Sequence, residues 1–244
     1  MTRALRTPSR LEESLQYTSL AAPSVPLYLR LIGDGEFSPE QLVGYELGYR
    51  TYITGSGFIG VSGFYNRYSD LLSVENQPAA PETSPPPLHF VLPLYFRNGI
   101  EAQTKGVEVS ALFDLRSWWR LQGSYSYLHL NAERARSSDD ASTVGQLQGD
   151  SPEHKVVVQS FLTLPGALGL SLTYRYVGAL TGSDQKVPAY STGDVRIARR
   201  IARGVELSLV GQNLFQPRHA EYGGDPGGLV GIRRSAYLKL TWTR

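Results

Sequence analysis

Apolar and polar residues alternate with a period of two between Lys105 and Leu115. The odd-numbered positions are apolar: Val107, Val109, Ala111, Phe113 and Leu115. The even-numbered positions are small or polar, with Leu112 as the one exception: Gly106, Glu108, Ser110 and Asp114. Period two is typical of a β-strand with one apolar and one polar face. The run spans about nine residues, which a tilted strand needs to cross a bilayer. The pattern therefore predicts a membrane-crossing strand.

The same alternation returns along the chain. We predict nine strands, at residues 42–53, 58–68, 95–115, 119–127, 154–164, 168–176, 190–201, 205–213 and 232–244, with a further strand stub in Met1–Arg10. Their apolar faces are rich in tyrosine, with Tyr125, Tyr127, Tyr174 and Tyr176 at one end and Trp119 and Trp242 at the other. Two aromatic belts of this kind border the membrane in outer-membrane barrels. Core aromatics of a soluble β-protein are the alternative interpretation.

Short turns alternate with long loops. The turns fall near Gly55, Arg116, Pro165 and Arg203, and we expect loops at 11–38, 75–93, 132–151 and 216–231. Residues 75–93 contain six prolines, so we predict no central strand there. Short turns at one side and long loops at the other are typical of an all-β, antiparallel up-and-down transmembrane barrel.

Composition and motifs exclude several functions. The chain has no cysteine and a net charge of +2 without a basic block, so we expect neither thiolate chemistry nor nucleic-acid binding. Strand carboxylates (Glu46, Glu108, Asp114 and Glu206) show no sign of converging on one pocket, and we expect them to pair with Arg50, Arg120 and Arg175 on the polar face. The four histidines (His89, His129, His154 and His219) lack i, i+2 or i, i+4 partners, so we expect no metal site, no cofactor and no catalysis.

Five phrases carry a family resemblance. They are the start, MTRALRTPSR; PEQLVGYELGYR at 39–50; FYNRYSDLL at 64–72; NGIEAQTKGVEVSA at 98–111; and GQNLF at 211–215. Together they resemble the barrel of the TonB-dependent outer-membrane receptors, and the likeness extends along essentially the whole chain.

The resemblance implies a fold and a function. Such receptors are 22-stranded barrels closed by an N-terminal plug. They import scarce ligands such as ferric siderophores or cobalamin with energy supplied through TonB. Residues 1–244 would then be a partial barrel domain, about the last nine or ten strands, without signal peptide, TonB box, plug and earlier strands. We expect such a fragment not to transport on its own. The implied location is the outer membrane of a Gram-negative bacterium, and the implied partners are outer-membrane lipid, a ferric siderophore, the plug, the TonB complex and the barrel-assembly machinery.

The ligand site is expected in the outward loops. A cationic and aromatic mouth would suit an anionic ferric chelate, and two of the loops supply candidates: Arg134, Arg136, Arg218, His219 and Tyr222. Two other classes stay open at this point, a small barrel for passive diffusion and a soluble β-sandwich binding module. The sequence does not name the ligand.

Overall fold

The structure is a computed structural model. It describes residues 1–244 except 23, 34, 54, 56, 183–185, 224–228 and 244. Thr54 and Ser56 of the first predicted turn and Arg244 of the last predicted strand therefore lie outside the described residues.

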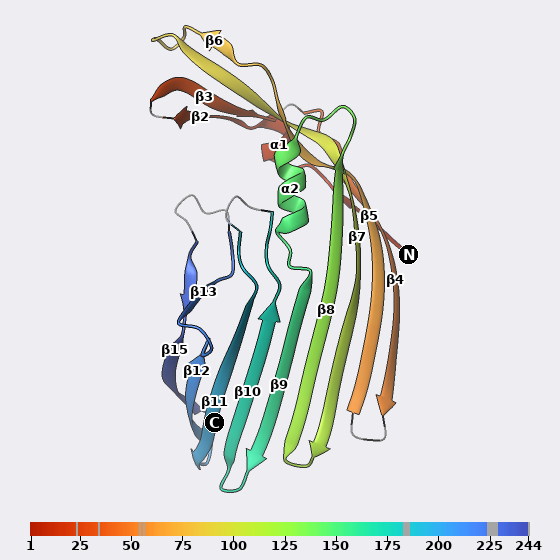
Figure 1. Ribbon diagram of the computed structural model, residues 1–244, viewed down its shortest axis with the longest axis vertical. Coiled ribbons are helices and arrows are strands. Elements are labelled where there is room, and N and C mark those ends of the chain that lie inside the picture. Colours follow the sequence, from red (N-terminus) through yellow and green to blue (C-terminus); the bar gives the residue numbers. More distant parts are fainter. Residues whose placement is uncertain are drawn as a thin grey trace. The chain divides into compact units, whose positions relative to one another are not determined.

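One strand order runs through the chain. It is β1-β4-β5-β7-β8-β9-β10-β11-β12-β15 and can be followed in Figure 1. The bounds are β1 Thr2–Arg6, β4 Glu40–Ile53, β5 Gly57–Asn76, β7 His89–Arg116, β8 Trp119–Arg134, β9 His154–Leu164, β10 Leu168–Val177, β11 Tyr190–Ala202, β12 Val205–Gln212 and β15 Ser235–Trp242. The nine predicted strands and the stub are confirmed in this order. The soluble sandwich is not, since a sandwich would divide its strands between two packed sheets.

The strands from β8 onwards pair in antiparallel register, and each face keeps its chemistry across the pairs. On one face, Leu170 lies opposite Leu162 of β9 and Ile197 of β11. Leu209 of β12 likewise lies opposite Leu238 of β15. On the other face, Thr173 is flanked by Gln159 and Asp194. The chain therefore builds one apolar and one polar face, as the alternation predicts.

Tight turns close one end of these hairpins. β7 ends at Arg116 and β8 begins at Trp119, β9 and β10 are joined through 165–167, and β11 and β12 through 203–204. Gly55, Gly166 and Gly204 have φ of +67°, +76° and +71°, a conformation that costs glycine nothing. The predicted turn positions are confirmed.

The predicted loops contain secondary structure that the sequence analysis missed. The elements are α1 Arg10–Ser14, β2 Gln16–Ala22, β3 Val25–Ile32, β6 Ala80–Glu82, α2 Ala141–Gly149, β13 Arg218–Ala220 and β14 Gly231–Arg233. The expectation of no central strand in 75–93 was wrong at both ends of the segment, because β5 continues to Asn76 and β7 begins at His89. Residues 90–95 of β7 pair with β3 in parallel, with Pro93 opposite Arg30. The last predicted strand, 232–244, is divided at Arg234 into β14 and β15.

The chain divides into two compact units. The first comprises Met1–Tyr45, Tyr65–Thr104 and Leu130–Gln148, and the second Glu46–Phe64, Lys105–His129 and Gly149–Arg244. A small core in the first unit consists of Ile100, Ala102 and Ala132, against which Val144 and Leu147 of α2 pack. Neither helix among the described residues is long and apolar enough to span a membrane.

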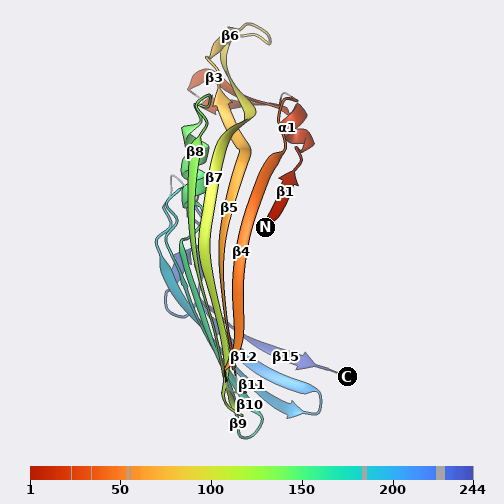
Figure 2. The same cartoon turned by 90° about the vertical axis from the view of Figure 1, so that its right-hand side faces the viewer.

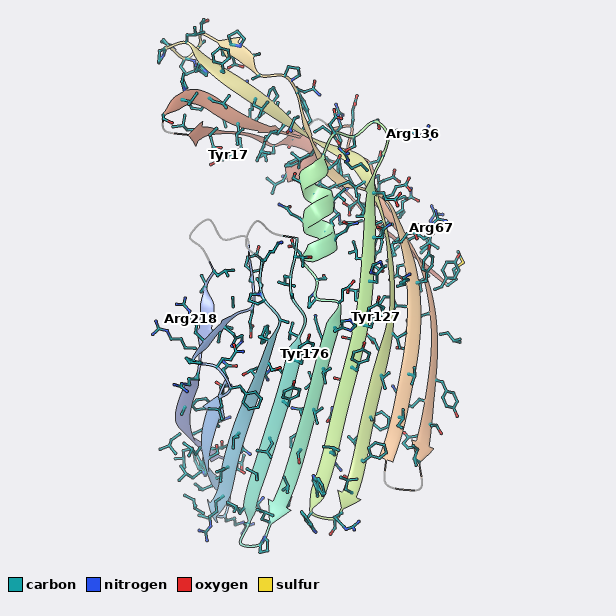
Figure 3. The ribbon with its side chains drawn as sticks, viewed as in Figure 1. Tyr17, Arg67, Tyr127, Arg136, Tyr176 and Arg218 are labelled. Atoms are coloured by element: carbon teal, nitrogen blue, oxygen red, sulfur yellow. The ribbon has the colours of Figure 1, made fainter. Side chains whose placement is uncertain are left out.

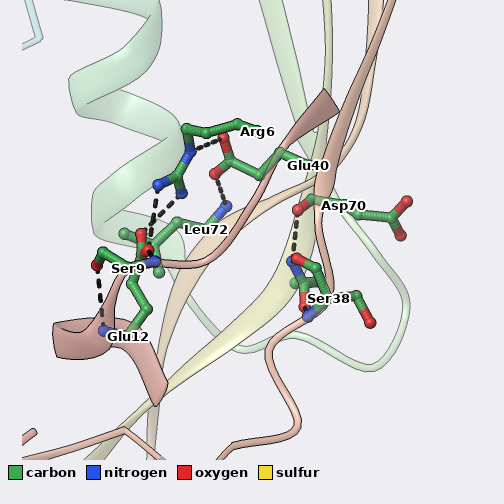
Figure 4. Close-up of polar contacts among 8 residues, drawn as sticks. Arg6, Ser9, Glu12, Ser38, Glu40, Asp70 and Leu72 are labelled. Carbon is green, nitrogen blue, oxygen red and sulfur yellow. Dashed lines mark hydrogen bonds and ion pairs between the residues drawn. The ribbon is translucent and has the colours of Figure 1, made fainter. Parts of the chain in front are cut away.

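An ion-pair cluster fixes α1 in the first unit. Ser9 caps α1 in a capping box with Glu12. Arg6 of β1 bridges Glu12 and Glu40, with N–O distances of 2.7 and 2.6 Å, and Glu40 also accepts from the backbone N of Leu72 at 3.0 Å. Figure 4 shows these contacts, and Figure 2 shows α1 beside β1 and β4. The short helix is therefore fastened to two strands through one guanidinium.

Candidate ligand-binding site

A pocket of about 390 Å³ lies in the second unit, where β9, β10 and β11 meet the connections far from the tight turns. We call it the Tyr222 pocket. Lys155 of β9, Arg175 of β10 and Tyr190 of β11 contribute to its wall, and Glu221 and Tyr222 come from the chain after β13. Arg175 is oriented by Asp194, 2.8 Å away across the β10–β11 pair. The pocket thus combines two cations, Lys155 and Arg175, and two carboxylates, Asp150 and Glu221, with aromatic surface.

His219 lies behind this wall. Its side chain is 3% exposed, and its ring stacks on Tyr190 with centroids 4.4 Å apart. Nε2 lies 2.9 Å from a carboxylate oxygen of Glu221, while Nδ1 has no hydrogen-bond partner among the described residues. A neutral ring that donates from Nε2 leaves Nδ1 as an acceptor. His219 therefore positions Tyr190 and Glu221 and is shielded from direct contact with a large ligand.

The five residues predicted from sequence are not gathered in one place. Only Tyr222 lines the pocket, which it shares with Glu221, the partner of His219. Arg218 of β13 is exposed, and its side chain lies against Gly231 of β14, where an added Cβ would come within 2.3 Å of its Nε. Arg218 lines no part of the Tyr222 pocket.

Arg134 and Arg136 belong to the first unit. Both are exposed, Arg134 as the last residue of β8 and Arg136 in the turn before α2 (Figure 3). The sequence reasoning missed Lys155 and Tyr190 altogether and treated Arg175 only as a charge to be paired. Their positions in the sequence could have indicated them, since each of the three lies on a strand close to the end that leads into a long connection.

The polar face of the second unit forms an open groove of about 740 Å³. Glu46, Arg50, Glu108, Ser110 and Lys155 contribute to it. Of the four carboxylates predicted to pair with Arg50, Arg120 or Arg175, Asp114 pairs with Arg120 as expected and Glu206 pairs with Arg196 instead. The ion pairs on this face are Arg120 with Asp114 at 2.6 Å, Arg175 with Asp194, and Arg196 with Glu206. Arg50 instead lies over the ring of Phe58, with its Cζ 5.7 Å from the ring centroid. Arg175 thus neutralises a carboxylate on the adjacent strand that the sequence analysis did not consider.

Among the residues that the structure describes, no three His, Asp or Glu side chains come together as metal ligands. The described lining of the Tyr222 pocket offers cations, tyrosine faces and carboxylate acceptors on a wall of strands.

Residues 2–214 match the family described as TonB dependent receptor-like, beta-barrel. Because the match extends over most of the chain, the protein belongs to this family. The comparison with curated proteins gave no match.

Solved structures agree on the fold. A mutant of the ferric enterobactin receptor PfeA from Pseudomonas aeruginosa is 17% identical with a TM-score of 0.72, over 98% of this chain and 37% of that one. The siderophore receptor PirA from Acinetobacter baumannii is 15% identical with a TM-score of 0.72, over 98% and 38%. The copper transporter OprC is 15% identical with a TM-score of 0.65, over 98% and 35%. The chain thus spans between a third and two fifths of the length of these structures.

Proposed function

We propose that the chain forms part of the barrel wall of an outer-membrane active transporter, coupled to TonB, that imports a scarce ligand. The observation that carries this proposal is a sheet with one apolar and one polar face, in a chain that belongs to the receptor barrel family. On the apolar face Leu47, Leu238 and Leu240 are 83%, 70% and 65% exposed, which would be costly in water and is favourable in lipid. The opposite face holds the charged groove that an aqueous lumen requires.

The strand order also bears on partners. Among the described residues β1 and β15 stand at the two ends of the order, each with one neighbour in it. Unpaired strand edges in a bilayer cost several kcal/mol for each unsatisfied backbone group. We therefore propose that residues 1–244 act as a partial barrel domain beside further strands, a plug and the TonB complex, after insertion by the barrel-assembly machinery.

For the ligand we propose a ferric siderophore, bound at the Tyr222 pocket. Lys155 and Arg175 can donate hydrogen bonds to the oxygens of a chelate, and Tyr222, which is 69% exposed, offers a ring face to an aromatic one. PfeA and PirA are named as siderophore receptors, which supports this choice. OprC is named as a copper transporter, so a copper complex is the second candidate.

The test uses the full-length receptor that contains this chain, folded into vesicles and titrated with ferric enterobactin and with Cu²⁺ as probes. Tyr222→Ala should weaken binding of the ferric catecholate by about threefold to tenfold. Tyr17→Ala is the matched control, because Tyr17 of β2 is comparably exposed at 56% and lies in the other unit. Equal affinities for the two variants would remove the Tyr222 pocket from the binding site.

A further inference from the structure

The described lining of the Tyr222 pocket carries no net charge. Its cations are Lys155 and Arg175, and its carboxylates are Asp150 and Glu221. Every other residue of the described lining is uncharged, and most of these are valine or tyrosine. An anionic ligand would therefore meet as many carboxylates as cations in this pocket, so its charge would gain little from binding there.

The partners of these charges reduce the attraction for an anion further. Arg175 lies 2.8 Å from Asp194, so a carboxylate already compensates its charge before a ligand arrives. Glu221 instead accepts from Nε2 of His219 at 2.9 Å, and the neutral ring holds this carboxylate without cancelling its charge. With Asp194 included, the carboxylates at the pocket outnumber the cations.

The segments that lie outside the described residues add no cation beside this lining. Residues 183–185 stand in the sequence between Leu180 and Val187 of the lining, and residues 224–228 follow Tyr222 closely. Their charged residues are Asp184 and Asp225. Lys186, the cation next to the first of these segments, is exposed and lines no part of the pocket. The balance of charge therefore does not depend on these segments to exclude an anion.

The aromatic surface has the same preference. Tyr176 of β10, labelled in Figure 3, and Tyr222 present rings in the lining. The face of an aromatic ring is electron-rich and attracts cations rather than anions. The valines of the lining add apolar surface that suits an uncharged part of a ligand. The pocket thus offers more to a neutral or cationic ligand than to an anionic one.

We propose that the Tyr222 pocket selects ferric chelates without net negative charge, such as trihydroxamates, over anionic ones such as tricatecholates. Each hydroxamate carries a single negative charge, so a trihydroxamate balances Fe³⁺, whereas each catecholate carries a double charge and the complex stays anionic. This inference rests on the proposed function, because it names the class of ferric siderophore that the same pocket binds. It departs from the anionic chelate expected from the sequence. Lys155 and Arg175 donate hydrogen bonds to the chelate oxygens in this arrangement.

The experiment varies the charge of one chelate. The full-length receptor that contains this chain is folded into vesicles and titrated with ferrioxamine B, a ferric trihydroxamate with a free ammonium group. The same chelate is then used after acetylation, which makes it neutral, and after succinylation, which makes it anionic. The cationic and neutral forms should bind about threefold to fivefold more tightly than the anionic form, the usual effect of one exposed charge. High salt should reduce this difference.

A conservative variant assigns the selectivity to the pocket. Glu221→Gln removes a negative charge and keeps an oxygen that accepts from His219, so it should tighten binding of the anionic form by about threefold to fivefold and leave the neutral form unchanged. Asp150→Asn should act in the same direction. Glu206→Gln is the matched control, because Glu206 lies in the same unit, pairs with Arg196 and lines no part of the pocket.

The outcomes separate this inference from the proposed function. Equal affinities for the three forms, tighter binding of the anionic form, or the same shift with Glu221→Gln and Glu206→Gln would overturn the inference alone, since a ferric chelate would still bind. Binding of ferric enterobactin without binding of any ferrioxamine would also overturn it alone. A folded and inserted receptor that binds no ferric chelate would overturn the proposed function and this inference with it.

Discussion

At the scale of single residues, buried polar groups fasten the connection between β8 and α2. Asp140, 3% exposed, caps α2 by accepting from the backbone N of Ser142 and Thr143 at 3.1 and 3.0 Å. Its other oxygen accepts from the backbone N of Val74 on β5 at 2.6 Å. Burial alone would raise the pKa of Asp140, but these hydrogen bonds outweigh it and lower the pKa. One carboxylate thus starts the helix and attaches it to the sheet.

Replacing this carboxylate should release α2. Asp140→Ala removes the cap and leaves the Val74 N–H without its acceptor, so the helix should lose about 1–3 kcal/mol of local stability. Hydrogen exchange of the amides in 141–149 measures this loss. Asp139→Ala is the control, because Asp139 is exposed and the hydrogen bonds of the cap are made by the Asp140 carboxylate. Equal exchange in the two variants would contradict the assigned role.

Gly99 is needed for the same attachment. A Cβ at this position would come within 2.6 Å of the Ser73 Oγ, 2.7 Å of a Glu75 carboxylate oxygen and 2.7 Å of the Ser138 Cβ. Those groups are themselves engaged, since Ser73 accepts from the Gly99 N at 3.0 Å and Ser138 donates to Glu75 at 2.6 Å.

Gly99→Ala should therefore destabilise the first unit by about 1–3 kcal/mol, the usual cost of overpacking. Gly145→Ala in α2 is the matched control, because its added Cβ meets nothing within 4 Å and alanine favours a helix by about 1 kcal/mol. Denaturant unfolding should show a lower free energy of unfolding for Gly99→Ala and a higher one for Gly145→Ala, each compared with the parent chain. An unchanged free energy of unfolding in Gly99→Ala would show that the side chains around Gly99 can move aside without loss of stability.

At the scale of elements, the sequence predicts the strands well and the outward elements poorly. A strand such as β10 is specified by its own alternation, from Leu168 to Tyr176, whatever lies beside it. The segment that forms α2, ASTVGQLQG, has a glycine in its middle and only a weak apolar stripe. Its helical state depends on Asp140 and on the packing of Val144 and Leu147 against Ile100, which are contacts distant in sequence. Lys155 and Tyr190 were missed for the same reason, since they meet the predicted Tyr222 in one pocket only in the fold.

The stability of the short helix α1 should depend on pH through the ion pair between Arg6 and Glu12. The guanidinium of Arg6 holds the pKa of Glu12 at about 2, against an ordinary value of 4.5. A lowered folded-state pKa contributes stability above the ordinary value, and this contribution is lost as the pH falls from about 4.5 toward 2. The protection of the α1 amides against hydrogen exchange, corrected for the intrinsic rate, should fall in this window.

Two variants separate Glu12 from its neighbour. Glu12→Gln should show weak protection at every pH and lose most of the dependence, whereas Glu13→Gln, changed at an exposed position of the same helix, should behave as the parent chain does. A full pH dependence in Glu12→Gln would assign the effect to another carboxylate.

At the scale of the whole molecule, the argument concerns the two environments that the strands separate. Period two forces neighbours in sequence onto opposite faces, so adjacent positions provide the sharpest comparison. Leu172 and Thr173 are such a pair in the middle of β10. Leu172 is 39% exposed between Ser160 and Val195, and Thr173 accepts from Gln159 at 3.4 Å on the polar face.

Arginine at these two positions should have unequal costs. Leu172→Arg places a charge toward lipid and should cost about 2–4 kcal/mol near the bilayer midplane, because the guanidinium loses its hydration there. Thr173→Arg places the same side chain among Gln159 and Asp194, where water and a carboxylate solvate it, and should cost much less. The measurement is reversible folding into bilayers of each variant of the full-length receptor that contains this chain. Equal costs in bilayers would mean that the two faces do not meet lipid and water, and would overturn the transport proposal on which the role of the Tyr222 pocket depends.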